Sequence, residues 1–195
     1  MKIDPAALPQ SGSFALVAYI PAPLGDFLQT LRDRLPGEEK PQAHITVLPP
    51  RPLKSPVEAA SKLAKRILKD FHPFPVSLST VKVFKETNIL YLEIATGNNT
   101  LHQLHDALNT GVLAHEENFQ FLPHLTISGP VPTERLAGVK KNAAQAWRKH
   151  AGEKGFEVSQ VVALWQPPRG SWDDWNRLWE QTLGPSGNSA TAGRS

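Results

Sequence analysis

The 195-residue sequence contains no cysteine, which excludes disulfide bonds, thiolate zinc sites and a cysteine nucleophile. It also lacks a G-x-S-x-G turn, so a hydrolase built on a serine nucleophile elbow is not expected. No charged-then-apolar leader pattern opens the chain. Its longest apolar run, residues 14–24, is interrupted by Pro21 and Pro23 and is too short to cross a bilayer. We therefore expect a cytoplasmic protein that has no membrane contact.

Neither positive nor negative charge is in large excess, because the sequence has 21 Lys and Arg residues and 18 Asp and Glu residues. The net charge of +3 and the pI of about 9.2 favour an anionic ligand. They do not indicate the dense positive surface of a protein that coats nucleic acid. The 40% hydrophobic and 20% charged residues are typical of a soluble globular protein. The length fits one domain, or two small lobes that share a core.

One short pattern occurs twice, at residues 44–47 (His-Ile-Thr-Val) and residues 124–127 (His-Leu-Thr-Ile). In a β-strand, side chains alternate between the two faces, so His and Thr of each copy would share one face and the apolar residues the other. Two such strands side by side would place two imidazoles and two hydroxyls in one cleft. That set suits a phosphate ester, because it supplies a base, an acid and two neutral hydrogen-bond donors.

Hydrophobic periodicity predicts alternating strands and helices along the chain. Strands are expected over residues 14–20, 43–50, 74–84, 89–94, 123–130 and 156–165, with a hairpin formed by 74–84 and 89–94. Amphipathic helices are expected over residues 24–35, 56–71, 100–113 and 134–151, with N-caps at Ser55, at Asn98 or Asn99, and at Thr133. Residues 175–183 fit a helix or an edge strand, and residues 184–195 are expected to be a disordered tail.

The order of these elements repeats. Each His-Thr strand is followed by a proline turn, a helix and a strand that begins Phe-x-Val-Ser, at residues 74–77 and residues 156–159. This repetition predicts two similar lobes related by a pseudo-two-fold axis, with the two His-Thr strands together at the lobe junction. It also favours a strand over residues 175–183, where the second half needs a counterpart to the strand at 89–94.

Two H-x-T motifs about 80 residues apart, each in an apolar strand followed by a helix and strands, resemble the 2H phosphoesterase superfamily. Its best-known branch holds the 2′-5′ RNA ligases and cyclic-nucleotide phosphodiesterases. The resemblance covers residues 14–183 and implies an α+β fold. That fold has two pseudo-symmetric lobes, each an antiparallel sheet flanked by helices, with a cleft between them. We expect residues 1–183 to form this single two-lobed domain.

The resemblance also implies a function: a metal-independent phosphodiesterase acting on RNA or nucleotide 2′,3′-cyclic phosphates or 2′-5′ linkages, with ligation as the reverse reaction. The family's catalytic histidines carry over to His44 and His124, and its substrate-binding hydroxyls to Thr46 and Thr126. No cofactor is implied, and we expect a monomer. Some ligase-branch members carry a basic residue after the second motif, where this chain has Ser-Gly-Pro at residues 128–130. Arg51 and Lys54, near the first motif, are the candidates to replace it.

Two alternative functions stay open at this point. One is a non-catalytic protein that binds RNA ends in the same cleft. The other is a metal-dependent hydrolase built from His102, His105 and His115, although spacing at i and i+3 is more typical of a solvated helix face. The basic residues of the helix at 56–71 could bind RNA, but they are more simply explained as its solvent-exposed face. The tryptophans could stack on bases, but we expect them to fill the core. The basic residues concerned are Lys62, Lys65, Arg66 and Lys69.

Overall fold

The computed structural model describes residues 12–37, 41–168 and 174–185, and most of the predicted tail lies outside these ranges. The strands are β1 (Ser13–Tyr19), β2 (His44–Pro52), β3 (Phe74–Phe84), β4 (Ile89–Ile94), β5 (His124–Pro130), β6 (Gly155–Val158), β7 (Gln160–Gln166) and β8 (Asn176–Thr182). The helices are α1 (Leu24–Asp33), α2 (Val57–Leu68), α3 (Asn98–Leu108), the short 3₁₀ helix η2 (Gly111–Leu113) and α4 (Thr133–Lys149).

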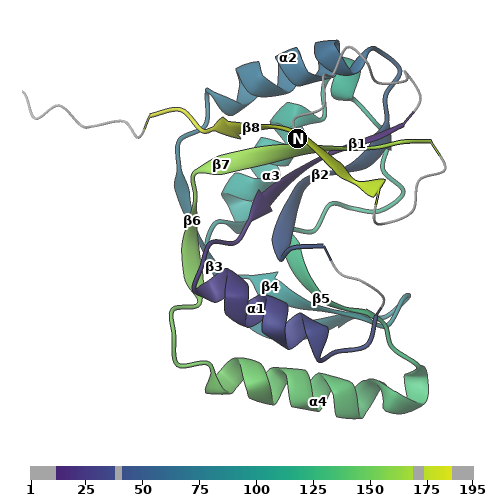
Figure 1. Cartoon of the computed structure of the whole chain (residues 1–195), viewed down its shortest axis with the longest axis vertical. Coiled ribbons are helices and arrows are strands. Elements are labelled where there is room, and N and C mark those ends of the chain that lie inside the picture. Colours follow the sequence, from purple (N-terminus) through teal and green to yellow (C-terminus); the bar gives the residue numbers. More distant parts are fainter. Residues whose placement is uncertain (1–11, 38–40, 169–173, 186–195) are drawn as a thin grey trace, which may run out of the picture.

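The strands form two antiparallel four-stranded sheets, in the orders β2-β1-β7-β8 and β5-β4-β3-β6. Figure 1 shows α2 and α3 with the first sheet and α1 and α4 with the second, so each sheet and its helices make one lobe. The predicted α+β fold with two lobes is confirmed. None of the helices in the described part of the chain is both long and apolar enough to cross a membrane.

Three strands of one lobe correspond to three of the other, β2, β1 and β7 to β5, β4 and β3. Each half of the sequence contributes a strand to the other half's lobe. β3 follows the first motif but joins β4 and β5, whereas β7 follows the second motif but joins β1 and β2. The Phe-x-Val-Ser segments pair with each other: Phe74 lies opposite Val158 and Val76 opposite Phe156. The two copies are therefore related by a pseudo-two-fold axis at the Pro75–Glu157 pair, in agreement with the internal repeat.

The core explains why the two motif strands lie where they do. Ile45, Val47, Leu125 and Ile127, the apolar residues of the motifs, have no exposed side-chain surface. Complete burial of such a side chain stabilises the fold by about 1.5–3 kcal/mol, which fixes which face of each strand turns inward. One apolar cluster runs through both lobes, and β2 and β5 lie against each other where the lobes meet. His and Thr of each motif are thereby left on the opposite face.

Some predicted element boundaries were wrong. The strand expected over residues 156–165 is two strands, because the chain crosses from the second sheet to the first between β6 and β7. The helix expected over 100–113 ends at Leu108 and is followed by η2. The predicted N-caps are also wrong: Pro56, Gly97 and Pro132 occupy those positions, and Thr133 is already helical. The hairpin of β3 and β4 and the strand within residues 175–183 are confirmed. That strand is not the counterpart of β4, however, because β4 pairs with its motif strand as β1 does, whereas β8 pairs with β7.

Candidate functional site

His44 begins β2, on the face opposite the buried Ile45, and is half-buried. Tyr19 of β1 lies directly across from it in the sheet. The Nδ1 atom of His44 is 2.7 Å from the backbone carbonyl oxygen of Gln42. Because a carbonyl oxygen can only accept a hydrogen bond, Nδ1 carries the proton. In the neutral ring the lone pair therefore lies on Nε2, which leaves that atom available as a base.

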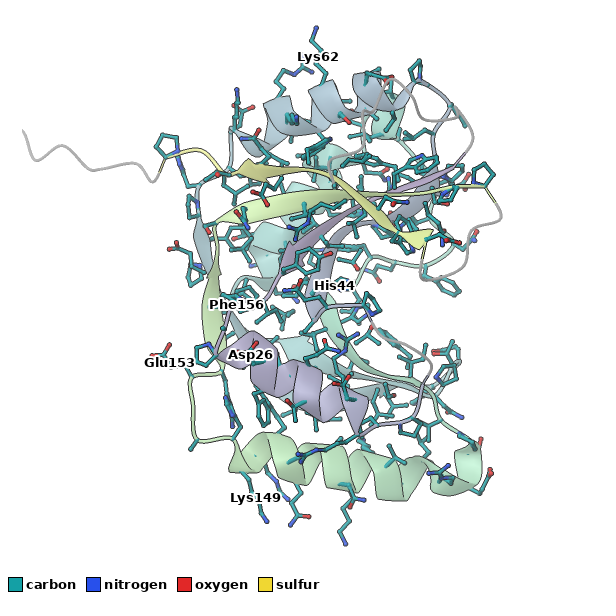
Figure 2. The ribbon with its side chains drawn as sticks, in the orientation of Figure 1. Asp26, His44, Lys62, Lys149, Glu153 and Phe156 are labelled. Carbon is teal, nitrogen blue, oxygen red and sulfur yellow. The ribbon has the colours of Figure 1, made fainter. Side chains whose placement is uncertain are left out.

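The segment just before His44 is fixed by α1. The backbone N–H of Ala43 donates to the side-chain oxygen of Gln29 at 3.1 Å. The buried guanidinium of Arg32 donates to the carbonyl of Pro41 at 2.6 Å and to the same Gln29 oxygen at 3.0 Å. These bonds determine where β2 starts, and so hold the imidazole in place at the lobe junction, where Figure 2 shows it.

His124 begins β5 in the same manner as His44 begins β2. Its Nδ1 donates to the carbonyl of Leu122 at 2.6 Å, so Nε2 is again the free nitrogen of the neutral ring. Its surroundings differ, because two aromatic rings meet its edge: Phe84 at 4.8 Å and Tyr91 at 5.5 Å between ring centroids. Glu93 lies opposite His124 in the sheet, and Tyr91 lies opposite Thr126.

The electrostatics of the site favour neutral imidazoles. Burial lowers the pKa of His44 below its ordinary value of 6.5, and the positive charges of Arg32 and protonated His124 lower it further. Burial also lowers the pKa of His124. The carbonyl bonded to each Nδ1 opposes the shift without reversing it. The positive charge of a protonated His124 acts on His44, so the two rings share one electrostatic environment. Protonation of one ring therefore disfavours protonation of the other.

A cleft of about 840 Å³ opens at the lobe junction. Thr46 from the first repeat and His124 from the second both line it. His44 and Thr126 are half-buried on the same strands as these two residues but are not among the lining side chains. The other lining residues come from the ends of β2, β3 and β4, from the turn between β3 and β4, from α3 and from the segment before β5: Pro49, Pro50, Phe84, Glu86, Thr87, Ile89, His102, His115, Glu117, Asn118, Phe119, Gln120, Phe121 and Leu122.

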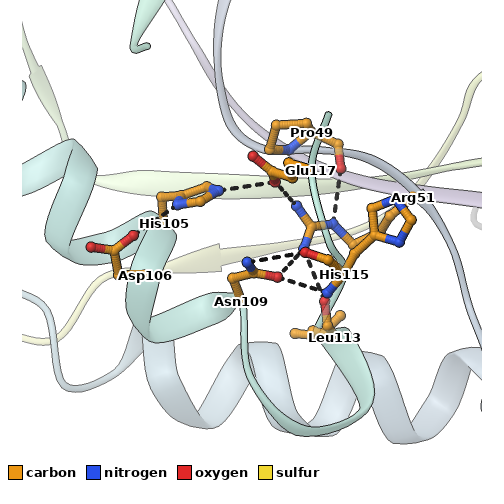
Figure 3. Close-up of polar contacts among 8 residues, drawn as sticks. All are labelled: Pro49, Arg51, His105, Asp106, Asn109, Leu113, His115 and Glu117. Carbon is orange, nitrogen blue, oxygen red and sulfur yellow. Dashed lines mark hydrogen bonds and ion pairs between the residues drawn. The ribbon is translucent and has the colours of Figure 1, made fainter. Parts of the chain in front are cut away.

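Arg51 is not a phosphate ligand, contrary to the role considered for it in the sequence. Its side chain is 1% exposed and donates four hydrogen bonds (Figure 3). The guanidinium donates to Glu117 at 2.5 Å, to the side chain of Asn109 at 2.6 Å, and to the carbonyls of Leu113 and Pro49 at 2.9 and 3.0 Å. It therefore ties the first motif strand to residues 114–122, the segment that lines the cleft and leads into the second motif.

The remaining basic candidate and the serine after the second motif are also outside the site. Lys54 is exposed and does not line the cleft. Ser128 is buried; its hydroxyl accepts a hydrogen bond from the backbone N–H of Leu90 at 3.0 Å and donates to the Gly129 carbonyl at 2.8 Å. The Ser128 side chain therefore stabilises the pairing of β4 with β5 and does not bind a ligand.

His105 does not lie on a solvated helix face, and that prediction was wrong. Its side chain is buried, with one ring nitrogen 3.0 Å from Glu117 and the other 3.0 Å from Asp106, and its ring stacks on Phe121 at 3.9 Å. It thus supports the same segment as Arg51. No group of three His, Asp or Glu side chains that could hold a metal ion is found within residues 12–37, 41–168 and 174–185.

The surface and core predictions for the other candidates hold where the structure describes them. Lys62 and Arg66 are exposed on α2, Lys69 is exposed directly after it, and Lys65 covers the ring of Trp179 at 4.9 Å. Trp147, Trp165 and Trp179 are buried in the core, whereas Trp175 is half-buried and Trp172 lies outside the described residues. Sequence reasoning missed the Arg51–Glu117 pair, because nothing in the local pattern signals a partner 66 residues away.

Comparison of the sequence with protein families matches the 2′-5′ RNA ligase superfamily over residues 20–170. Curated relatives include "Putative phosphoesterase GK0864" of Geobacillus kaustophilus, 29% identical over 168 residues, which span 82% of this chain and 91% of that protein. A second, "Putative phosphoesterase GWCH70_0799" of a Geobacillus strain, is 30% identical over 156 residues, which span 75% of this chain and 84% of that protein.

Solved structures with the same fold include E. coli LigT, at a TM-score of 0.61 and 13% identity, covering 90% of this chain and 99% of LigT. TT0787 of Thermus thermophilus gives a TM-score of 0.62 at 16% identity, covering 88% of this chain and 97% of that protein. At these identities the likeness concerns the fold alone, which agrees with the two-lobed arrangement of sheets described above.

Proposed function

Because this chain belongs to the 2′-5′ RNA ligase superfamily, a branch of the 2H phosphoesterases, we propose that it hydrolyses 2′,3′-cyclic phosphates or 2′-5′ linkages of RNA or nucleotides. The observation that supports this proposal best is the symmetry of the two motifs. Each repeat presents a half-buried imidazole whose Nδ1 is committed to a backbone carbonyl and whose Nε2 is free. Under this proposal no metal takes part, and ligation is the reverse of the same reaction.

The proposed reaction is an in-line displacement at phosphorus, with one histidine on each side. A neutral histidine takes a proton from water through Nε2, and the water oxygen attacks phosphorus. The P–O bond to one ribose oxygen breaks on the opposite side, and the protonated second histidine donates a proton to that oxygen. The product is a phosphomonoester, and the two histidines have exchanged protonation states. The residues assigned to these roles are His44 and His124, and the pseudo-two-fold symmetry allows either to be the base.

Thr46 and Thr126 are assigned to the non-bridging phosphate oxygens. Their hydroxyls lie two residues beyond each histidine on the same strand face. Under this proposal they donate hydrogen bonds to the oxygens that carry the phosphate charge in the transition state. A hydrogen bond to a charged group contributes about 1.5–3 kcal/mol. We therefore expect Thr46→Val and Thr126→Val each to lower kcat by about tenfold to 10²-fold. Thr182→Val, at an exposed strand position of β8, is the matched control. Unchanged kcat in both motif variants would remove the threonines from the mechanism.

The pH dependence of kcat/KM should be bell-shaped, with its maximum on the acidic side of pH 6.5. Burial lowers the pKa of both His44 and His124 from that ordinary value. The productive pair, one ring neutral and one protonated, is most populated between the two lowered values. As the pH rises the acid loses its proton, and as it falls the base becomes protonated.

The kcat profile reports the enzyme–substrate complex, in which the phosphate charge raises both histidine pKa values, so its maximum should lie at higher pH than that of kcat/KM. Both profiles can be recorded from initial rates on one cyclic nucleotide. A kcat/KM maximum well above about pH 7 would show that these two histidines do not control the reaction.

The direct test of the proposed function is hydrolysis of nucleoside 2′,3′-cyclic monophosphates by the purified chain, with and without EDTA. We expect turnover that survives chelation and disappears when the motif histidines are replaced. If no cyclic phosphate or 2′-5′ linkage is cleaved but RNA fragments ending in a cyclic phosphate bind, the protein is the non-catalytic RNA-end binder. Loss of activity on chelation would instead favour a metal-dependent reaction.

A further inference from the structure

The lining of the cleft offers little positive charge to a phosphate. None of the described side chains that line it is Lys or Arg, whereas Glu86 and Glu117 both do. The two buried arginines of the described chain are committed to the protein itself, since Arg32 donates to the Pro41 carbonyl and Arg51 to Glu117. Apart from a protonated motif histidine, a cation for a bound phosphate would have to reach it from outside the lining residues.

Strand β3 contains an irregularity that determines where Lys82 points. Between the pairs Leu78–Ile94 and Val81–Leu92, β3 advances by three residues while β4 advances by two. This is the residue count of a β-bulge, and the extra residue shifts the alternation of side chains along the rest of the strand. Leu78 and Val81 are both buried, so Lys82 lies on the outward face, whereas strict alternation from Leu78 would have turned it into the core.

The outward face of β3 at Lys82 is also the face that carries the second motif. Lys82 lies directly opposite Tyr91 of β4, and Tyr91 lies directly opposite Thr126 of β5. Directly opposite residues of antiparallel strands share a face, with Cβ atoms about 5 Å apart, so Lys82 and Thr126 end one cross-strand row about 10 Å long. Phe84, the next outward residue of β3, meets the ring of His124 at 4.8 Å, in agreement with this assignment of faces.

The ammonium group of Lys82 is available to a ligand. Its side chain is exposed, and the ion pairs found among the described residues do not include it. Glu93, which lies diagonally across from Lys82 on β4, instead accepts hydrogen bonds from the hydroxyls of Ser79 and Thr80 at 3.1 and 3.2 Å. Ser79 and Thr80 are the residues of the bulge, so the same irregularity that turns Lys82 outward also occupies this carboxylate.

We propose that Lys82 binds the non-bridging phosphate oxygen that Thr126 also contacts. This inference rests on the proposed function and adds a substrate-binding residue to it. The flexible four-carbon stem of lysine can carry the ammonium past Tyr91 toward a phosphate held by Thr126, and a compact ammonium suits a phosphate oxygen. The ligand class is a phosphate anion, whose charge the ammonium offsets in the bound state and in the transition state.

The first test measures kcat/KM for adenosine 2′,3′-cyclic monophosphate. Lys82→Met should lower it by at least about tenfold, the lower end for a hydrogen bond to a charged group, and Lys82→Arg should retain most of it because the charge remains. Lys85→Met is the matched control, because it removes the same charge from an exposed position three residues away and should change kcat/KM by less than about twofold. Equal kcat/KM in Lys82→Met and Lys85→Met would overturn the inference.

Double variants test which oxygen Lys82 contacts. Because Lys82 and Thr126 share one oxygen, the effects of Lys82→Met and Thr126→Val on kcat/KM should combine to clearly less than their product. The effects of Lys82→Met and Thr46→Val, which belong to different oxygens, should multiply to within about twofold. Coupling of Lys82 to Thr46 that is as strong as its coupling to Thr126 would overturn the assignment to the Thr126 oxygen.

A binding measurement separates this inference from the proposed function, because it needs no turnover. Titration calorimetry compares adenosine 2′-monophosphate with adenosine. Lys82→Met should weaken binding of the nucleotide by about tenfold and leave binding of adenosine unchanged. That result supports the Lys82 site even if no cyclic phosphate is hydrolysed. If cyclic phosphates are hydrolysed but the native and Lys82→Met chains bind the nucleotide equally, the proposed function stands and the Lys82 site is wrong.

Discussion

Replacing either His44 or His124 by alanine should lower kcat for a 2′,3′-cyclic nucleotide by at least about 10², since one general acid or base typically contributes 10²- to 10⁴-fold. Each variant removes the Nε2 atom of one motif histidine, the ring nitrogen that is not bonded to a backbone carbonyl. The double variant should be little worse than either single variant, because the two groups act in one step and their effects are not additive. The measurement is single-turnover hydrolysis with enzyme in excess.

Two controls separate proton transfer from positioning. His44→Asn keeps a side-chain N–H that can donate to the Gln42 carbonyl but has no second ring nitrogen, so it should be as inactive as His44→Ala. His72→Ala removes an exposed imidazole that does not line the cleft and should leave kcat unchanged. Because burial lowers the pKa of both motif histidines, they are largely neutral in the free protein at pH 7, and their removal leaves no unpaired charge. Activity of His44→Asn near that of the native chain would contradict the acid–base role.

The second large effect is on stability: Arg51→Met should lower the free energy of unfolding by about 3–5 kcal/mol, the usual cost of removing one partner of a buried ion pair. The variant leaves Glu117, whose side chain is 16% exposed, without its closest cation, and leaves the acceptors on Asn109 and Leu113 without their donor. Burial lowers the pKa of Arg51, because a charged guanidinium loses its hydration in the interior, and the negative charge of Glu117 raises that pKa again. The ion pair therefore offsets part of the free-energy cost of burying the charge. Urea denaturation would measure the change.

An ion pair on the surface provides the matched comparison. Arg177 and Glu180 lie 3.7 Å apart and are 51% and 54% exposed, so Arg177→Met should cost less than about 1 kcal/mol. The double variant Arg51→Met, Glu117→Gln removes both buried charges and should recover part of the loss. Equal destabilisation by Arg51→Met and Arg177→Met would mean that the buried pair does not hold the cleft segment.

Several features of this protein follow from short stretches of sequence. The alternation of His-Ile-Thr-Val and His-Leu-Thr-Ile was sufficient to predict that Ile45 and Leu125 would be buried and that the histidines would lie on the other face. The repeated order of a His-Thr strand, a proline turn, a helix and a Phe-x-Val-Ser strand was sufficient to predict two related lobes. The first prediction relies on side-chain periodicity within one strand, which depends only on neighbouring residues, and the second relies on comparing the two halves of the sequence.

Other features depend on residues far apart in the chain, and only the tertiary structure decides them. The exchange of β3 and β7 between the lobes splits a predicted single strand into β6 and β7. The burial of Arg51 and His105 depends on Glu117, and the wall of the cleft gathers residues from β3, β4 and the segment before β5. No local period encodes such contacts, because a buried charge or an exposed ring is determined by what the rest of the fold places beside it. The sequence alone determined the two imidazoles and their faces, and the tertiary structure determined the walls of the cleft around them.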